Sequence, residues 1–102
     1  MQISVLTPDR TLFTGPIRSV TVPGTNGNFQ ILNNHAPIVS ALGKGTVELV
    51  TGDGNYELYD ETTGKVTTAA ETGRTVRYRV EGGFVEVLKN EVSLLLQGVT
   101  TA

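Results

Sequence analysis

Short apolar runs separated by turn-forming residues recur along the chain. Several runs alternate apolar and polar positions, as in "SVTV" and "TVRYRV", and this period of two is that of a strand with one buried face. No segment keeps a 3.6-residue apolar period for two helical turns. The pattern therefore predicts strands at residues 3–7, 11–14, 19–22, 28–32, 38–42, 46–50, 75–80, 84–88 and 91–96.

Glycine and proline stand between the predicted strands and indicate tight turns. Short turns join antiparallel neighbours, and many short strands in 102 residues are typical of a sandwich. We therefore expect an all-β fold, a two-sheet antiparallel β-sandwich of about ten short strands in a single domain over residues 1–102. The predicted turns are Pro8-Asp9, Gly15-Pro16, Pro23-Gly24, Gly43-Lys44-Gly45, Gly52-Asp53-Gly54 and Gly82-Gly83.

The stretch 53–74 differs in composition from the rest of the chain, because it is polar and rich in threonine around Thr63-Gly64. One interpretation is an exposed hairpin of "YELYD" and "KVTTA" around "ETTG", and the other is a mobile loop. We favour the hairpin.

Charge and composition argue against several classes of protein. The net charge is −2, the pI is about 5.2 and the eight basic residues are scattered, so no nucleic-acid footprint is expected. The absence of cysteine excludes thiol catalysis, disulfides and thiolate zinc sites. The start "MQISVLTPDR" is not a signal peptide and no apolar run is long enough to span a membrane, so we expect a soluble or peripherally attached protein.

His35 is the one histidine, and no acidic residue lies within ten positions of it. A general base needs a nucleophile within hydrogen-bond reach and usually a carboxylate that orients it. A turn or surface histidine is therefore the preferred interpretation, and a small hydrolase built around His35 ranks last.

Metal and cofactor sites are not expected. Asp53, Asn55 and Glu57 have the spacing of a calcium loop, but Leu58 stands where glycine is needed and Gly64 where a bidentate glutamate belongs. The glycine-rich "GTNG" and "GDGN" open no helix that could hold a phosphate. Asn26-Gly27 is better explained as a turn with positive φ, and Asn33-Asn34 tolerates left-handed conformations.

Two longer stretches carry a family resemblance. "VTVPGTNGNFQILNNHAPIVSALGKGTVEL", followed by "EGGFVEVLKNEVSLLL", resembles the N-terminal β-sandwich domain of the epsilon subunit of the bacterial F-type ATP synthase, called delta in mitochondria. The patterns "PGxxGxFxIL…HAPIVxxLxxG" and "GGFVEV…V" occur in family order and near family spacing. The resemblance covers nearly the whole chain except roughly residues 55–72, which look like a segment inserted into the family pattern.

The resemblance implies a non-catalytic rotor subunit of the central stalk, without a cofactor, which couples ion-driven rotation to ATP synthesis. The implied partners are the gamma subunit and the membrane c-ring. By position, the turn of Thr25, Asn26, Gly27 and Asn28 matches the c-ring-facing loop of the family, and Thr7, His35 and Ser40 match gamma-facing positions.

The chain departs from the family at two places. Asn33-Asn34 stands where the family often has Pro-Gly, and the c-ring turn, which is often acidic, carries the neutral Asn26 and Asn28. Many members continue into a two-helix domain that can inhibit hydrolysis or bind ATP, whereas this chain stops at Ala102. We therefore expect neither self-inhibition nor ATP sensing.

The lack of a presequence favours a bacterial protein held peripherally on the cytoplasmic face of the inner membrane. The alternative from another class is a freestanding sandwich that binds a glycan or a protein, since fold alone does not fix function. That hypothesis would use Tyr56, Tyr59 and Tyr78 as aromatic platforms.

Overall fold

A computed structural model of the chain describes residues 1–101, and its regular elements are all β-strands. No helix in this part of the chain has the length and apolar character to cross a membrane. The strands are β1 (Gln2–Leu6), β2 (Thr11–Gly24), β3 (Gly27–Leu32), β4 (Ile38–Leu42), β5 (Gly45–Thr51), β6 (Tyr56–Asp60), β7 (Lys65–Ala69), β8 (Thr75–Val80), β9 (Gly82–Leu88), β10 (Glu91–Gln97) and β11 (Thr100–Thr101).

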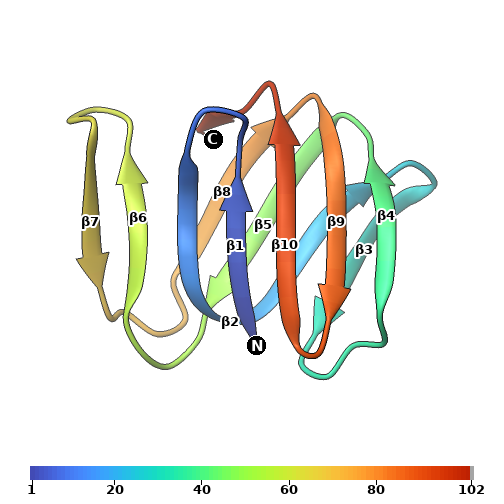
Figure 1. The fold of residues 1–102 in the computed structure, drawn as a ribbon, viewed down its shortest axis with the longest axis horizontal. Coiled ribbons are helices and arrows are strands. Elements are labelled where there is room, and N and C mark those ends of the chain that lie inside the picture. The colour runs from blue at the N-terminus through green and yellow to red at the C-terminus, as the bar shows by residue number, and fades with distance from the viewer. Residues whose placement is uncertain (102) are drawn as a thin grey trace.

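The strands form two layers that face each other, and β2 belongs to both (Figure 1). The first half of β2 pairs with β1 and β6, and its second half pairs with β3 and β5. The front layer in Figure 1 has the order β7-β6-β2-β1-β10-β9-β4, and the back layer has the order β3-β2-β5-β8-β11. The predicted β-sandwich is confirmed.

The core lies between the layers and follows the alternation of the sequence. In β10 the buried Val92, Leu94 and Leu96 alternate with exposed residues, as a strand with one buried face requires. Burial of one such side chain stabilises the fold by about 1.5–3 kcal/mol. The other fully or nearly buried apolar side chains are Ile3, Val5, Leu12, Phe13, Ile17, Val20, Val22, Ile31, Leu42, Val47, Leu49, Tyr56, Tyr78, Val80, Val85 and Val87.

Gly15 and Pro16 lie inside β2, so the prediction of a turn between two separate strands is wrong here. Gly15 has a φ of 156°, and a Cβ at this position would lie 2.5 Å from the Cβ of Tyr56. The register of β2 against β5 shifts between Ile17 and Ser19. Glycine and the bulge therefore let one strand bend from the front layer into the back layer.

Two further expectations need correction. Gly82 and Gly83 belong to β9, and the connection from β8 is Glu81 alone. β1 pairs in parallel with β10, although every other pairing is antiparallel within the described chain. Tight turns fix the direction of sequence neighbours only, and β1 and β10 are far apart in the sequence.

The favoured hairpin over the threonine-rich stretch is confirmed as β6 and β7. β6 adds to the front layer through Phe13 and Thr14 of β2, so the hairpin extends this layer outward at the left of Figure 1. The ring of Tyr56 stacks on Phe13 with centroids 5.2 Å apart, and Arg74 donates a 3.0 Å hydrogen bond to the Tyr56 hydroxyl. Packing thus anchors the base of the hairpin, whereas β7 is exposed for most of its length.

Candidate functional site

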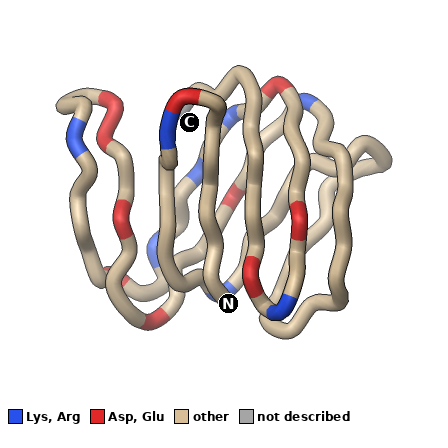
Figure 2. The backbone as a smooth tube through the Cα atoms, viewed as in Figure 1, with Lys and Arg blue, Asp and Glu red and all other residues tan. Residues whose placement is uncertain are grey.

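One row of side chains on the outer face of the front layer is apolar on each of four neighbouring strands. The register places Leu6, Leu95, Phe84 and Ala41 next to one another across β1, β10, β9 and β4. Charged residues are scarce on these strands, because β1 and β4 have none and β9 and β10 have one glutamate each (Figure 2). One row of the outer face is therefore apolar across four strands, which a strand face that meets water seldom shows, whereas the next row, Ser4, Ser93 and Glu86, is polar.

Four of the six exposed large hydrophobic side chains of the described chain lie on this face. We call them the apolar surface: Val39, Phe84, Leu88 and Leu95. Of the other two, Val66 lies on the hairpin, and Leu32 lies on β3 of the back layer, where Ile31 faces the core. Contiguous apolar area of this kind on a small protein marks an interaction site.

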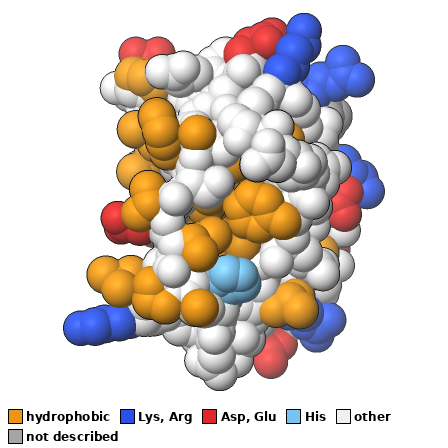
Figure 3. All heavy atoms as spheres, turned by 90° about the vertical axis from the view of Figure 1, so that its right-hand side faces the viewer, with side chains coloured by type: hydrophobic (Ala, Val, Ile, Leu, Met, Phe, Trp, Pro, Cys, Tyr) orange, Lys and Arg blue, Asp and Glu red, His pale blue; other side chains and the backbone are white. Residues whose placement is uncertain are grey.

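His35 lies at the margin of the apolar surface, in the connection between β3 and β4. In Figure 3 its ring is surrounded by hydrophobic side chains, and these continue to the left onto the outer face of the front layer. The Nδ1–H of His35 donates a 2.7 Å hydrogen bond to the Ala36 carbonyl, so this nitrogen carries the proton. The ring orientation is thus set by the local backbone.

Ser40 lies on β4, close to His35 along the chain, and its hydroxyl donates a 3.3 Å hydrogen bond to the Ala41 carbonyl. Within the described residues β4 pairs with β9 along its length and with β2 only at Leu42. The edge of β4 that faces away from β9 therefore leaves the backbone beside Ser40 accessible to a partner.

The connection that carries His35 is held by a residue from another turn. Asn90 accepts a 2.8 Å hydrogen bond from the backbone N–H of Asn34 and donates a 2.8 Å bond to the Asn33 side chain. Asn34 has a φ of 62°, as its sequence allowed. Asn33-Asn34 is thus a defined turn, clamped from the β9–β10 turn.

Thr7 lies apart from His35, in the turn between β1 and β2 at the opposite end of the sandwich (Figure 1). Its hydroxyl accepts hydrogen bonds from the N–H groups of Asp9 and Arg10, at 3.3 and 3.2 Å, and closes the turn. The three predicted gamma-facing residues therefore form two groups, with His35 and Ser40 in one and Thr7 in the other.

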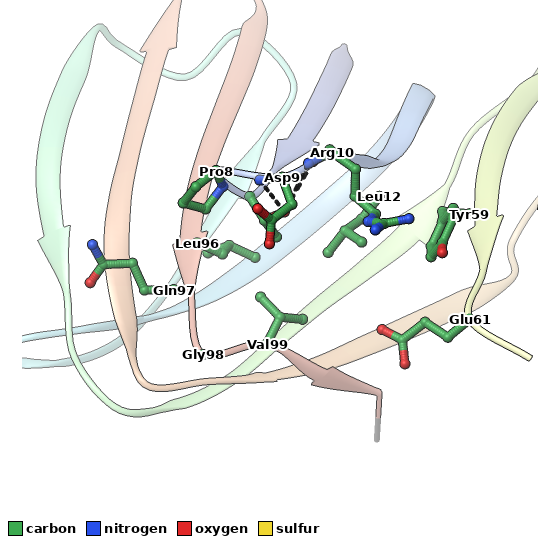
Figure 4. A pocket seen from close by; sticks show the side chains of 11 residues that line it. Pro8, Asp9, Arg10, Leu12, Tyr59, Glu61, Leu96, Gln97, Gly98 and Val99 are labelled. Atoms are coloured by element: carbon green, nitrogen blue, oxygen red, sulfur yellow. Dashed lines mark hydrogen bonds between the residues drawn. The ribbon is translucent and has the colours of Figure 1, made fainter. Parts of the chain in front are cut away.

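The turn with Thr7 borders a hollow of about 530 Å³ that also reaches the hairpin (Figure 4). Leu12, Leu96 and Val99 line its inner part, and the guanidinium of Arg10 lies 4.4 Å from the ring centre of Tyr59. This contact connects the turn to the hairpin.

The predicted c-ring turn is exposed at all four positions, Thr25 to Asn28. It joins β2 to β3, at the other end of β3 from His35. The positive φ expected there occurs at Gly27, with a value of 120°, and nothing lies within 4 Å of where its Cβ would be. The turn is therefore shaped by its backbone and free to meet another molecule.

The ionisable groups form no metal-binding cluster of three or more within the part of the chain that the structure describes. The predicted aromatic platforms are not available as such, because Tyr56 and Tyr78 are buried in the core. Burial raises the pKa of Tyr78, whose hydroxyl has no hydrogen-bond partner among the described residues. The hydrogen bond to Tyr56 raises the pKa of Arg74.

Comparison with known proteins agrees with these features. The family described as "ATP synthase, Delta/Epsilon chain, beta-sandwich domain" matches residues 1–60. The chain belongs to this family. The ATP synthase epsilon chain of Leptospira borgpetersenii serovar Hardjo-bovis is 36% identical over 95 residues, which cover 93% of this chain and 59% of the relative. The epsilon chain of Chlorobium limicola is 31% identical over 99 residues, which cover 97% of this chain and 91% of the relative.

Solved structures share the fold of this delta/epsilon family member. The mitochondrial ATP synthase of Euglena gracilis, an OSCP/F1/c-ring assembly, contains a chain with a TM-score of 0.71 and 19% identity, covering 97% of this chain and 51% of that one. A chain of the central stalk and c-ring of the Tetrahymena thermophila mitochondrial ATP synthase has a TM-score of 0.68 and 14% identity, covering 99% of this chain and 66% of that one. This chain thus spans 59% of the Leptospira relative and about half to two thirds of the solved chains.

Sequence reasoning found the exposed turn and the histidine but missed most of the apolar surface. Phe84, Leu88 and Leu95 occur in runs whose apolar content predicts strands, and that content alone gives no sign of which side chains face outward. The alternation of "FVEVL" could have revealed Phe84 and Leu88, because Val85 and Val87 occupy the inner face. No local signal pointed to Asn90.

Proposed function

We propose that this protein is a non-catalytic subunit of the central stalk of an F-type ATP synthase. In this role it binds the gamma subunit and the c-ring and helps to couple ion-driven rotation to ATP synthesis. Membership of the delta/epsilon family supports the proposal, as do relatives named ATP synthase epsilon chain. A freestanding binding module is not favoured, since the relatives reported above are all ATP synthase subunits.

The apolar surface is the observation that carries the proposal. A rotor subunit transmits force through lasting contacts, and a stable interface usually buries about 800 Å² on each partner. The apolar surface, with His35 at its margin and Ser40 on the adjoining edge strand β4, provides an apolar centre with polar groups beside it, which is the usual arrangement of an interface. We assign this surface to gamma, and Thr7 to a separate gamma contact at the other end of the front layer.

The turn of Thr25, Asn26, Gly27 and Asn28 is assigned to the c-ring. It is exposed and uncharged, so it would contact polar loops by amide and hydroxyl hydrogen bonds and not by ion pairs. The protein would be attached peripherally, through the complex, to the cytoplasmic face of a bacterial membrane. Residues 1–102 would act as one domain with the hairpin inserted at about 55–72.

Complex formation with purified gamma subunit from the same source tests the assignment. Size-exclusion chromatography with light scattering should show a 1:1 complex. Phe84→Asp should weaken it by at least about tenfold, because a charge would enter the apolar centre of the interface. Val66→Asp is the matched control, since Val66 is 58% exposed and Phe84 55%, yet Val66 lies on the hairpin. A folded wild-type chain that forms no complex at micromolar concentration would contradict the proposal.

The c-ring contact can be tested separately, because the chain has no cysteine of its own. A single Asn26→Cys variant, labelled at its thiol with a photoactivatable cross-linker and illuminated in the assembled enzyme, should become linked to a loop of the c subunit. A cysteine at Thr68, on the exposed hairpin, should not. Equal cross-linking from both positions would argue against the assignment of the turn.

A further inference from the structure

A shallow hollow opens on the apolar surface between β4 and β9. Its volume is about 230 Å³, which is small enough for one side chain of a partner. The register places Val39 directly opposite Glu86, with both side chains outward, and Leu88 is the next outward residue of β9. The lining residues are Pro37, Ile38, Val39, Glu86, Val87 and Leu88.

The hollow combines apolar walls with one carboxylate. Val39 is 73% exposed and Leu88 50%, so both offer hydrocarbon surface that gains from being covered. Glu86 is exposed and takes part in neither of the salt bridges of the described chain, which join Lys44 to Glu81 and Arg77 to Glu48. It is the one charged residue of β9.

No cation lies on the strands of this face. Glu91, at the start of β10, is the other outward charged residue on β1, β4, β9 and β10, and Lys89 lies in the turn between β9 and β10. A partner that covers the apolar surface with neutral residues would bury Glu86 without compensation, at a large cost in free energy. An anionic partner would be repelled.

We propose that this hollow receives a lysine or arginine side chain of the gamma subunit. The inference rests on the proposed function and deepens it. The methylene stem of the cation lies against Pro37, Val39 and Leu88, and its charged head meets the carboxylate of Glu86. The surrounding apolar contacts exclude water and so strengthen the ion pair. Glu86 thereby selects the charge of the partner, while the apolar surface supplies most of the buried area.

Charge substitution at Glu86 tests the inference on the complex with gamma. Glu86→Lys should weaken binding by about 30-fold or more, because two cations would meet inside the interface. Glu86→Gln should weaken it less and should make the affinity less sensitive to salt. Glu57→Lys is the control for net charge, since Glu57 is exposed on the hairpin, and it should bind like the wild type. Circular dichroism of each variant would show that the fold is retained.

A rescue experiment identifies the cation. The lysines and arginines of gamma would be changed to glutamate one at a time and each variant tested against the Glu86→Lys protein. One of them should restore binding, and failure of every one would overturn the inference. Undiminished binding of Glu86→Lys, together with loss of binding for Phe84→Asp, would also overturn it while leaving the proposed function intact.

Absence of binding by the wild-type chain would instead contradict the proposed function itself. A second copy of this chain is another molecule that could occupy the hollow, and light scattering of the isolated chain tests for such a dimer. A dimer that Glu86→Lys dissociates would assign the hollow to a second copy of this chain and overturn the inference.

Discussion

The backbone N–H of Asn34 donates a 2.8 Å hydrogen bond to the side chain of Asn90, which is 56 residues away in the sequence. This bond joins the β9–β10 turn to the connection that carries His35. The two turns lie at the same end of the sandwich, beside the apolar surface (Figure 1). A side chain from one turn thus fixes the shape of another.

Replacement of Asn90 by glycine should loosen this connection. Asn90 has a φ of 62°, which glycine adopts without strain, so Asn90→Gly removes the side-chain bonds alone. We expect a loss of about 1–2 kcal/mol in the free energy of unfolding, measured by urea denaturation. The amide of Asn34 should exchange faster with solvent.

Two further variants make this prediction specific. Lys89→Gly changes the neighbouring turn residue, at a φ of 49°, and controls for the entropy that glycine adds to the unfolded chain. Asn90→Asp keeps the acceptor for Asn34 and should keep its amide protected. Unchanged exchange of Asn34 in Asn90→Gly would show that the bond does not hold the connection.

Much of the fold could be predicted from the sequence, because the decisive signals are local. Alternation such as "EVSLLLQ" identifies both the strand and its buried face. The prediction of a turn at Gly15-Pro16 is wrong because glycine and proline favour a reversal of the chain and also a bend within a strand. The contact that favours a bend over a reversal is that of Tyr56, which packs against Gly15 from a distant strand.

The candidate site could be predicted where it depends on backbone chemistry. The residue types of Asn26-Gly27 predict a turn, whereas the apolar surface results from the register of four strands. Contacts between distant residues, such as that of Asn90 with Asn34, have no local signature. The insertion could be recognised as a hairpin, but its attachment to β2 depends on the packing of Tyr56 on Phe13.

The two buried tyrosines should respond in opposite ways to loss of the hydroxyl. The Tyr56 hydroxyl accepts a hydrogen bond from Arg74, so Tyr56→Phe should lower the free energy of unfolding by about 1 kcal/mol. The Tyr78 hydroxyl is buried without a partner among the described residues, so Tyr78→Phe should be neutral or stabilising. Thermal unfolding of both variants compares them directly. Equal destabilisation would mean that the Tyr78 hydroxyl does find a partner in solution.

Stability should fall in alkaline solution in a way that depends on Tyr78. Burial raises the pKa of this hydroxyl above its ordinary value of 10.0. Above about pH 10 the unfolded chain loses the proton while the folded protein keeps it, so the unfolded state binds fewer protons and stability decreases as pH rises. Below that pH both states are protonated and Tyr78 contributes no pH dependence.

The difference between wild type and Tyr78→Phe isolates this contribution from other groups that titrate at high pH. Urea denaturation at a series of alkaline pH values should show a steeper loss for the wild type. Parallel loss in the two proteins would contradict a raised pKa for Tyr78.

Glycine should be indispensable at Gly83 and only preferred at Gly27. Both have positive φ, at 149° and 120°, so alanine is strained at either position. At Gly83, however, a Cβ would collide with the backbone carbonyl oxygen of Leu95, whereas at Gly27 it would meet nothing within 4 Å. Backbone cannot move aside as a flexible side chain can, so β9 would have to separate from β10.

We expect Gly83→Ala to lose at least about 2 kcal/mol more than Gly27→Ala in the free energy of unfolding, measured by urea denaturation. Because Phe84 follows Gly83 and lies opposite Leu95, the same shift should also weaken binding of gamma, while Gly27→Ala should leave that binding unchanged. Similar losses of stability in the two variants would mean that the close approach of β9 to β10 relaxes in solution.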